Sequence, residues 1–161
     1  VWEVAVERRA VLLDPDGFLT VTGRTKDVVV TATGTPVEPR FLEDRLKRSP
    51  YVREAVLVGN GRPYLVALIG LAEDTLGAWA SEQSVPYTTY RDLTQKPEVR
   101  RLIGDWIDSV NEDLGPAEQI RGFRLLPTQL DVASGELTPT HRVRREVVIE
   151  RYAALVEDMY R

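Results

Sequence analysis

The chain has 161 residues, 43% of them hydrophobic, so it can bury the core of one domain, or of one domain with a small appendage. Its 21 lysines and arginines against 25 aspartates and glutamates give a net charge of −4, which argues against a general nucleic-acid binder, and we expect no nucleic-acid partner. With no cysteine and a single histidine, His141, the sequence excludes disulfides, zinc–thiolate sites, thiol nucleophiles and metal sites built on two histidines.

No targeting signal or membrane span is expected. The N-terminal residues lack a basic segment followed by an apolar one. The longest apolar run, at 64–71, is far shorter than the roughly 18–20 residues that a span needs. These features favour a cytoplasmic location. Because residue 1 is Val rather than Met, an excised fragment and a standalone protein both remain possible.

The first half of the chain predicts strands around one helix. Asp-Pro-Asp-Gly at 14–17 is a strong turn signal and predicts a β-hairpin over about 9–22, followed by a polar connector at 23–27. The β-branched run at 28–31 predicts a short buried strand. A helix is expected from Glu38-Pro39 to about Ser49-Pro50, with Phe41, Leu42, Arg45 and Leu46 forming its apolar stripe. Residues 51–58 and 64–71 are expected to form an antiparallel strand pair, joined by a tight polar turn at 59–63.

The second half predicts helices, one strand and a final helix. Residues 73–83 are expected to be helical, with Leu76, Trp79 and Ala80 facing inward. Residues 84–94 are expected to be irregular, with one turn at Tyr90–Leu93. A long amphipathic helix begins at Pro97 and ends at Gly115-Pro116, a strand follows at 120–126, and one helix is expected over 142–160. The predicted fold is α+β: an N-terminal β-hairpin plus a small mixed sheet packed with helices.

One charged region could bind an anion. Residues 138–151 hold four arginines against two glutamates, and we expect this cluster to lie at the N-terminus of the final helix, where free N–H groups favour a phosphate or carboxylate. The alternative is a solvated basic edge paired with its own glutamates. Glu43 and Asp44, adjacent on a helix, point about 100° apart and are expected on a solvated face rather than as a carboxylate pair.

Several motifs occur in order along the chain: Asp16-Gly17-Phe18-Leu19, Gly23 to Val30, Gly34, Val37, Pro39, Glu43, Gly59 to Ile69, Ala117 to Phe123, and Gly135 to Thr140. Together they resemble the adenylate-forming enzymes, and the later ones look like the long-chain fatty acyl-CoA synthetase branch. The resemblance covers about residues 10–160 and is limited to the small C-terminal lid subdomain. It implies a hairpin or linker at 1–22 and a lid at 23–161, with the N-terminal adenylation body on the same or a separate chain.

The resemblance also implies a reaction in two halves. ATP, with Mg²⁺, and a fatty acid give an acyl-adenylate and pyrophosphate, and CoA then gives the thioester. The lid rotates between these halves and presents a different face to the body each time. The isolated lid is expected to be inactive and to bind neither ATP nor CoA appreciably, because most contacts belong to the body. The sequence shows no metal ligands.

The resemblance assigns roles to five residues. Arg142 stands at the position of the family's catalytic lysine, which bridges the α-phosphate and the acyl carboxylate. Arg24 matches the arginine that contacts the nucleotide ribose, and Lys26 matches the hinge. Thr33 and Gly34 fall in the loop that approaches the CoA tunnel.

The chain departs from the family pattern at three places. Arg142 is larger and more directional than lysine, so we expect adenylation to be impaired by about 2–4 kcal/mol of transition-state stabilisation. The family's Thr-Gly-Asp is absent near residues 7–9, and Thr33 replaces an expected glycine, with Thr35-Pro36 in place of a more basic pair. Two further readings therefore remain open: a catalytically silent lid that acts in trans on a synthetase body or carrier protein, and a plain CoA- or nucleotide-binding domain.

Overall fold

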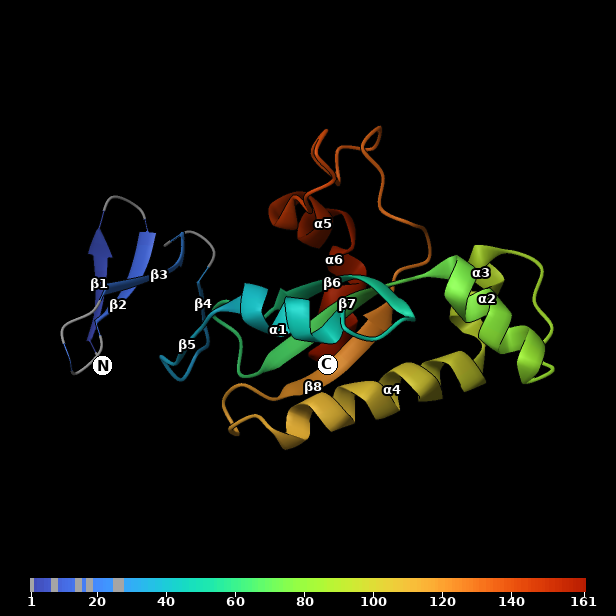
Figure 1. Ribbon diagram of the computed structural model, residues 1–161, viewed down its shortest axis with the longest axis horizontal. Coiled ribbons are helices and arrows are strands. Elements are labelled where there is room, and N and C mark those ends of the chain that lie inside the picture. The colour runs from blue at the N-terminus through green and yellow to red at the C-terminus, as the bar shows by residue number, and fades with distance from the viewer. Residues whose placement is uncertain (1, 7–8, 14–15, 17–18, 25–27) are drawn as a thin grey trace.

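The computed structural model describes the backbone of residues 2–6, 9–13 and 19–24, and the backbone and side chains of residue 16 and residues 28–161. Strands β1 (Trp2–Val6), β2 (Arg9–Leu13) and β3 (Leu19–Arg24) form an antiparallel sheet in that order. This sheet lies at one end of the molecule, apart from the central sheet (Figure 1). The predicted hairpin is confirmed as β2–β3, but β3 continues to Arg24, and β1 was not predicted because its order depends on pairing with β2.

A two-residue ladder and a helix connect this sheet to the rest. Strand β4 (Val29–Val30) pairs antiparallel with β5 (Pro36–Val37). Val29 is buried as expected, but Val30 is 42% exposed. Helix α1 (Pro39–Leu46) begins at a proline, which costs no hydrogen bond at the first helical position. Its predicted apolar stripe was wrong at Phe41, which is 61% exposed, because the buried face of the helix, with a spacing of three and four residues, consists of Pro39, Leu42 and Leu46.

The central sheet has the order β6-β7-β8. Strands β6 (Val52–Val58) and β7 (Leu65–Leu71) are antiparallel, as predicted from the tight turn between them. Strand β8 (Ile120–Leu125) runs parallel to β7, so the sheet is mixed. The crossover between β7 and β8 consists of α2 (Glu73–Glu82), α3 (Tyr90–Gln95) and α4 (Pro97–Glu112). Helix α3 lies where mostly irregular chain was expected, and the Thr89 hydroxyl caps it by accepting from the Asp92 N–H at 3.1 Å.

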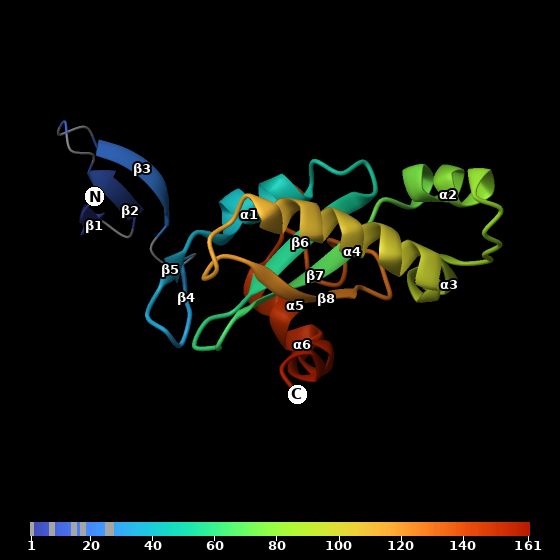
Figure 2. The same ribbon diagram turned by 90° about the horizontal axis from the view of Figure 1, so that it is seen from below.

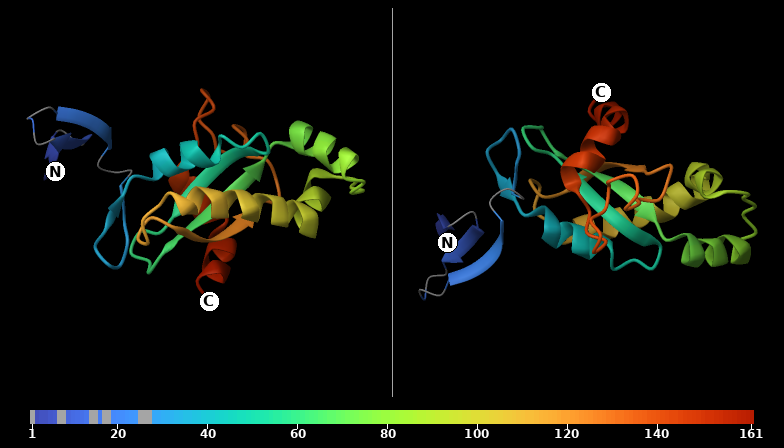
Figure 3. Two further views of the ribbon diagram at one scale, coloured as in Figure 1. Left: turned by 60° about the horizontal axis from the view of Figure 1, so that its bottom comes forward. Right: turned by 90° about the horizontal axis from the view of Figure 1, so that it is seen from above.

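The core lies on both faces of this sheet, and β7 is buried throughout. Leu65, Ala67 and Ile69 pack on the face covered by α1 and α4, whereas Val66 and Leu68 pack on the face covered by the C-terminal helices. The turned views show this layering, with α1 and α4 on one side of the sheet and the C-terminal helices on the other (Figures 2 and 3). The α+β prediction is therefore confirmed.

The C-terminal segment was expected to be one helix over 142–160, which was wrong. It forms α5 (Arg145–Arg151) and α6 (Ala153–Met159), separated at Tyr152. Tyr152 has φ −104° and ψ 26°, and its hydroxyl is held by partners outside the helices. On either side of the break, α5 contacts β6, whereas α6 contacts β7 and β8. Within the part of the chain that the structure describes, no helix combines the length and the hydropathy needed to cross a bilayer.

Candidate functional site

Arg142 lies in a tight hairpin formed by residues 136–144. The His141 N–H donates to the Thr138 carbonyl at 2.8 Å, and the Thr138 N–H donates to the Arg142 carbonyl at 2.8 Å. Pro139 occupies the turn position that its fixed φ favours. His141 has φ 59°, a left-handed conformation in which His is enriched over most residues with a side chain. The Thr-Pro-Thr-His sequence thus builds a turn that presents Arg142.

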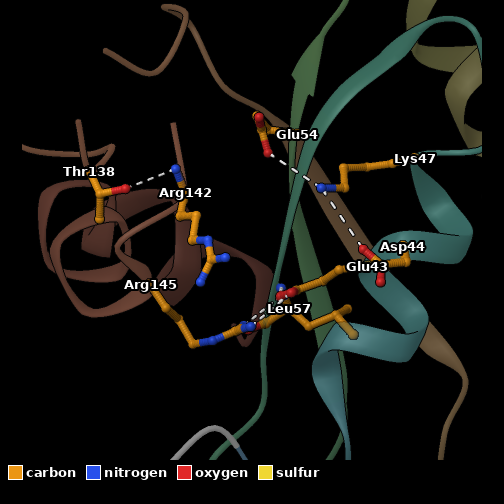
Figure 4. A network of polar contacts seen from close by, with 8 residues as sticks. All are labelled: Glu43, Asp44, Lys47, Glu54, Leu57, Thr138, Arg142 and Arg145. Carbon is orange, nitrogen blue, oxygen red and sulfur yellow. Dashed lines mark hydrogen bonds and ion pairs between the residues drawn. The ribbon is translucent and has the colours of Figure 1, made fainter. Parts of the chain in front are cut away.

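The side chain of Arg142 is exposed. Its backbone N–H donates to the Thr138 hydroxyl at 3.0 Å, but within the described residues its guanidinium has no hydrogen-bond or ion-pair partner (Figure 4). The expectation that Arg142 opens the final helix was wrong, because α5 begins only at Arg145. The Arg144 N–H is used by the hairpin instead, donating to the Glu136 carbonyl at 2.8 Å. Arg142 is therefore presented by a turn and not by a helix end.

A clamp joins the start of α5 to α1 and β6. Arg145 contacts Glu43 at 2.5 Å and also donates to the Leu57 carbonyl at 2.9 Å, while Glu43 accepts the Leu57 N–H at 2.8 Å. Since β6 is an edge strand, these two side chains satisfy both backbone groups of Leu57 on its open edge. The expectation that Glu43 faces solvent was wrong, since its side chain is 13% exposed, whereas that of Asp44 is 67% exposed.

The clamp also changes the charge expected for this region. Arg145 is paired with Glu43, and Arg151 is paired with Glu136 at 3.2 Å. The local excess of positive charge predicted from the sequence is therefore largely neutralised. Within the described residues, Arg142 and Arg144 have no carboxylate partner; the Arg144 guanidinium donates to the Gly135 carbonyl at 3.3 Å, whereas that of Arg142 has no partner.

Arg142 borders a polar groove of about 350 Å³ between the hairpin, α1 and β6. Lys47 lies 4.0 Å from Asp44 and 3.9 Å from Glu54, so each groove carboxylate has a cationic partner. Burial raises the pKa of the Glu54 carboxyl above its usual value, against the opposing pull of Lys47. The groove is lined by Arg40, Glu43, Asp44, Lys47, Glu54, Ala55, Val56, His141, Arg142, Val143 and Arg145.

Thr33 and Gly34 lie in the exposed turn between β4 and β5 and do not line this groove. Gly34 has φ +81°, which a side chain would strain, and its N–H donates to the Thr31 carbonyl at 2.9 Å. The Thr33 hydroxyl shares hydrogen bonds with those of Thr31, at 2.8 Å, and Thr35, at 3.3 Å. The three threonines therefore stiffen the turn, and Thr33 takes part in this network instead of supplying the flexibility of a second glycine.

The turn between β6 and β7 supports this loop. The Gly61 N–H donates to the Val30 carbonyl and the Ala32 N–H donates to the Arg62 carbonyl, both at 2.8 Å. The Asn60 side chain accepts the Val30 N–H at 3.3 Å. Residues 59–63, predicted only as the turn between two strands, thus also hold the segment that leads into Thr33 and Gly34.

Two of the sequence-predicted residues cannot be placed as side chains. Arg24 is the last residue of β3 and its backbone pairs with Arg9, but its side chain lies outside the described part of the chain. Lys26 lies outside the described residues altogether.

The donor set fits an anion presented from outside the domain. An exposed guanidinium without a partner can bind two oxygens of a phosphate or a carboxylate at once, as ATP or an acyl-adenylate would require. The groove carboxylates do not fit Mg²⁺, because each is already paired with Lys47 or Arg145.

Sequence reasoning missed the contacts that hold the site together. Glu136, Arg145 and Asn60 were not singled out as individual residues, although Glu136 and Asn60 lie inside quoted motifs. Each has a partner that is distant along the chain, at 16 positions for Glu136, 30 for Asn60 and 102 for Arg145, so no local pattern reports these contacts. The burial of Glu136 would have singled it out, but the residues around it show no pattern from which burial can be predicted.

Comparison with known proteins agrees with this architecture. Residues 26–161 match the family model of the AMP-binding enzyme C-terminal domain. The chain is 39% identical over 149 residues to the long-chain-fatty-acid–CoA ligase FadD15 of Mycobacterium tuberculosis, covering 92% of this chain and 25% of that protein. It is 31% identical over 166 residues to the long-chain-fatty-acid–CoA ligase ACSBG1 of Bos taurus, covering 92% of this chain and 23% of that protein.

The fold agrees with solved structures as well. The adenylation domain of a carboxylate reductase from Mycobacterium chelonae superposes with a TM-score of 0.72 at 27% identity, covering 96% of this chain and 22% of that chain. The chain thus spans about a quarter of the length of the curated relatives that it matches. Since the family model covers most of its residues, this chain belongs to the family of AMP-binding enzyme C-terminal domains.

Proposed function

We propose that this chain is the mobile C-terminal lid of a fatty acyl-CoA ligase. The reaction is the ATP-dependent adenylation of a fatty acid, followed by transfer of the acyl group to CoA. The fatty-acid–CoA ligase relatives support this substrate class, and their adenylation body would lie on the same or a separate chain. We propose residues 1–22 as the hairpin or linker to that body and residues 23–161 as the lid. The family match begins at residue 26.

One observation carries the proposal: the guanidinium of Arg142 is exposed on a well-anchored hairpin and has no partner among the residues that the structure describes. A cation left without a partner on a rigid turn costs little to keep in water and is ready to meet an anion. In the adenylation state, Arg142 would bind phosphate and carboxylate oxygens that the body holds. It would stabilise the negative charge that develops there when the acyl oxygen attacks the α-phosphate.

The second half-reaction would use a different surface. Thr33 and Gly34 lie on the β4–β5 turn, which is not part of the groove that Arg142 borders. Gly34 is exposed, and apart from its chain neighbours no heavy atom of the described residues lies within 4 Å of where its Cβ would be, so another chain or a ligand can approach the backbone there. We propose that this turn approaches the CoA tunnel, with Lys26 as the hinge and Arg24 as the contact to the nucleotide ribose.

Arg142 also motivates the expectation of impaired adenylation. A planar guanidinium does not replace the compact ammonium of the family's lysine without moving either the hairpin or the phosphate. A silent lid that acts as an interaction or regulatory module in trans is the competing function that this substitution favours. The catalytic lid and the silent module differ in a measurable way, because a silent lid needs no cation at residue 142.

The test is to compare the two half-reactions in Arg142→Ala and Arg142→Lys. The body should be the native one or a relative's body that lacks its own lid. Pyrophosphate release reports adenylation, and thioester formation from synthetic acyl-adenylate reports the second half. Arg142→Ala should lower adenylation by about 10²-fold, and Arg142→Lys should raise it above the native rate.

Arg100→Ala serves as the matched control, because Arg100 is exposed on α4, away from the hairpin. It should leave both half-reactions unchanged. Equal rates for Arg142→Ala, Arg142→Lys and the native protein would exclude the lid function and favour the silent module.

A further inference from the structure

Glu136 is the most deeply buried carboxylate among the described side chains, with 1% exposure. It lies at the start of the hairpin that presents Arg142 and does not contact the groove. The cost of removing a carboxylate from water is several kcal/mol unless donors surround it. The contacts of Glu136 must therefore compensate for the burial of its charge beside the candidate site.

Donors surround both oxygens of this carboxylate. Oε1 accepts the Tyr152 hydroxyl at 3.1 Å and faces the Arg151 Nε at 3.2 Å. Oε2 accepts the Asp131 N–H at 3.1 Å and the Ser134 hydroxyl at 2.9 Å. The carboxylate thus joins the loop at 131–135 to the junction between α5 and α6, with each contact directional.

The direction of one proton follows from this arrangement. An ionised carboxylate only accepts, so the Tyr152 hydroxyl must donate to Glu136. The Thr128 hydroxyl, 3.0 Å from that of Tyr152, then donates to Tyr152. Burial is the largest cause that raises the pKa of Tyr152, which keeps this phenol protonated and able to donate.

The contacts of Glu136 continue along the backbone to Arg142. The Glu136 carbonyl accepts the Arg144 N–H at 2.8 Å, and the next pair, Leu137 and Val143, forms an antiparallel bridge. Thr138 then bonds to Arg142 through both its N–H and its hydroxyl. The buried carboxylate therefore fixes one strand of the hairpin at its base, six residues from the exposed guanidinium.

An apolar side chain would fill the site of Glu136 at less cost in solvation. What it would lack is direction, because packing alone would not fix the position of the 131–135 loop relative to the α5–α6 junction. The second strand of the hairpin is held separately, by the clamp of Arg145 and Glu43. Two ion pairs thus anchor the two strands of one hairpin that ends in an unpaired cation.

We infer that Glu136 is a positioning residue for Arg142: its buried carboxylate orients the hairpin so that the guanidinium reaches the anion in the adenylation half-reaction. This inference rests on the proposed function of Arg142. Misplacement of a reacting group by about 1 Å costs on the order of 10²-fold in rate. Removing the charge of Glu136 should therefore slow adenylation. It should leave thioester formation, for which we propose the β4–β5 turn, unchanged.

The experiment is a double-mutant cycle in the complete ligase, with its adenylation body on the same or a separate polypeptide. The variants are Glu136→Gln, Arg142→Ala and both together, and the readouts are pyrophosphate release and thioester formation from synthetic acyl-adenylate. Glu136→Gln should lower adenylation by about 10- to 100-fold and thioester formation less than about twofold. In the Arg142→Ala background it should cause no further loss, because the two residues act as a unit.

Two further variants keep the test decisive. Tyr152→Phe removes one donor to Glu136 while keeping the buried ring, and it should show the same coupling to Arg142 with a smaller loss. Glu150→Gln is the matched control, since Glu150 is an exposed glutamate on α5, and it should change neither rate.

The failures are distinguishable. If Arg142→Ala leaves adenylation unchanged, the proposed function fails. If Arg142→Ala slows adenylation but neither Glu136→Gln nor Tyr152→Phe does, the inference about Glu136 is wrong and the proposed function stands. If the two variants slow both half-reactions equally, and do so equally in the Arg142→Ala background, Glu136 only supports the fold and the positioning role is excluded.

Discussion

The clamp between α5 and the edge of the central sheet predicts a large loss of stability in Arg145→Met. Methionine keeps most of the apolar stem but removes the guanidinium. The substitution leaves Glu43, 13% exposed, without its cation, and leaves the Leu57 carbonyl on the edge of β6 without a donor. Both groups then lose partners that water replaces only in part.

The magnitude follows from these two losses. Breaking a fully buried ion pair costs about 3–5 kcal/mol, and the partial exposure of Arg145 and Glu43, 24% and 13%, reduces this to about 2 kcal/mol. An unsatisfied backbone carbonyl adds about 1 kcal/mol. The free energy of unfolding should therefore fall by about 3 kcal/mol, which corresponds to a drop in Tm of about 6–12 °C for a chain of this size.

Thermal and urea unfolding of the purified chain measure this change. Arg144→Met is the matched control, because Arg144 is the adjacent arginine and is exposed, and the polar contact of its guanidinium within the described part of the chain is the one to the Gly135 carbonyl at 3.3 Å. It should change the free energy of unfolding by less than about 0.5 kcal/mol. If Arg145→Met and Arg144→Met unfold at the same temperature, the clamp does not stabilise the domain and the reasoning is refuted.

Two further predictions concern Tyr160, whose hydroxyl lies 3.2 Å from the Val58 carbonyl and 2.9 Å from the Tyr64 carbonyl, and Asn60. Burial raises the pKa of Tyr160 to about 12, so the stabilisation from its neutral hydroxyl is complete below the unfolded pKa of about 10 and is lost as the pH rises through 12. Tyr160→Phe should lower the free energy of unfolding by about 1–2 kcal/mol at neutral pH, and a difference from the native protein that stayed constant between pH 9 and pH 12 in urea titrations would contradict this. Asn60→Ala removes the acceptor for the Val30 N–H and should loosen the β4–β5 turn by about 0.5–1.5 kcal/mol. Thioester formation should slow while pyrophosphate release does not, and equal slowing of both would count against a role of that turn in the second half-reaction.

Elements with local signals were predicted well. Pro39 and Pro97 each begin a helix, and the polar turn at 59–63 joins two antiparallel strands. Elements whose existence depends on a distant partner were missed or misjudged. Strand β1 needs β2, the two residues of β5 need β4, and the break at Tyr152 needs Glu136 and Thr128 to hold the phenol. The direction of β8 likewise follows from the crossover through α4 rather than from its own residues.

The site divides in the same way. The sequence alone determined which chemistry is present: a cation at residue 142 after a Thr-Pro-Thr turn, and the ordered motifs that place the chain in its family. Only the tertiary structure decided which arginines are free to act, because Arg145 and Arg151 are neutralised by Glu43 and Glu136, residues that lie 102 and 15 positions away. Charge is a property of single residues and can be counted from a sequence. Whether a charge is paired depends on distances in space, which only the packing of α1, β6 and the hairpin sets.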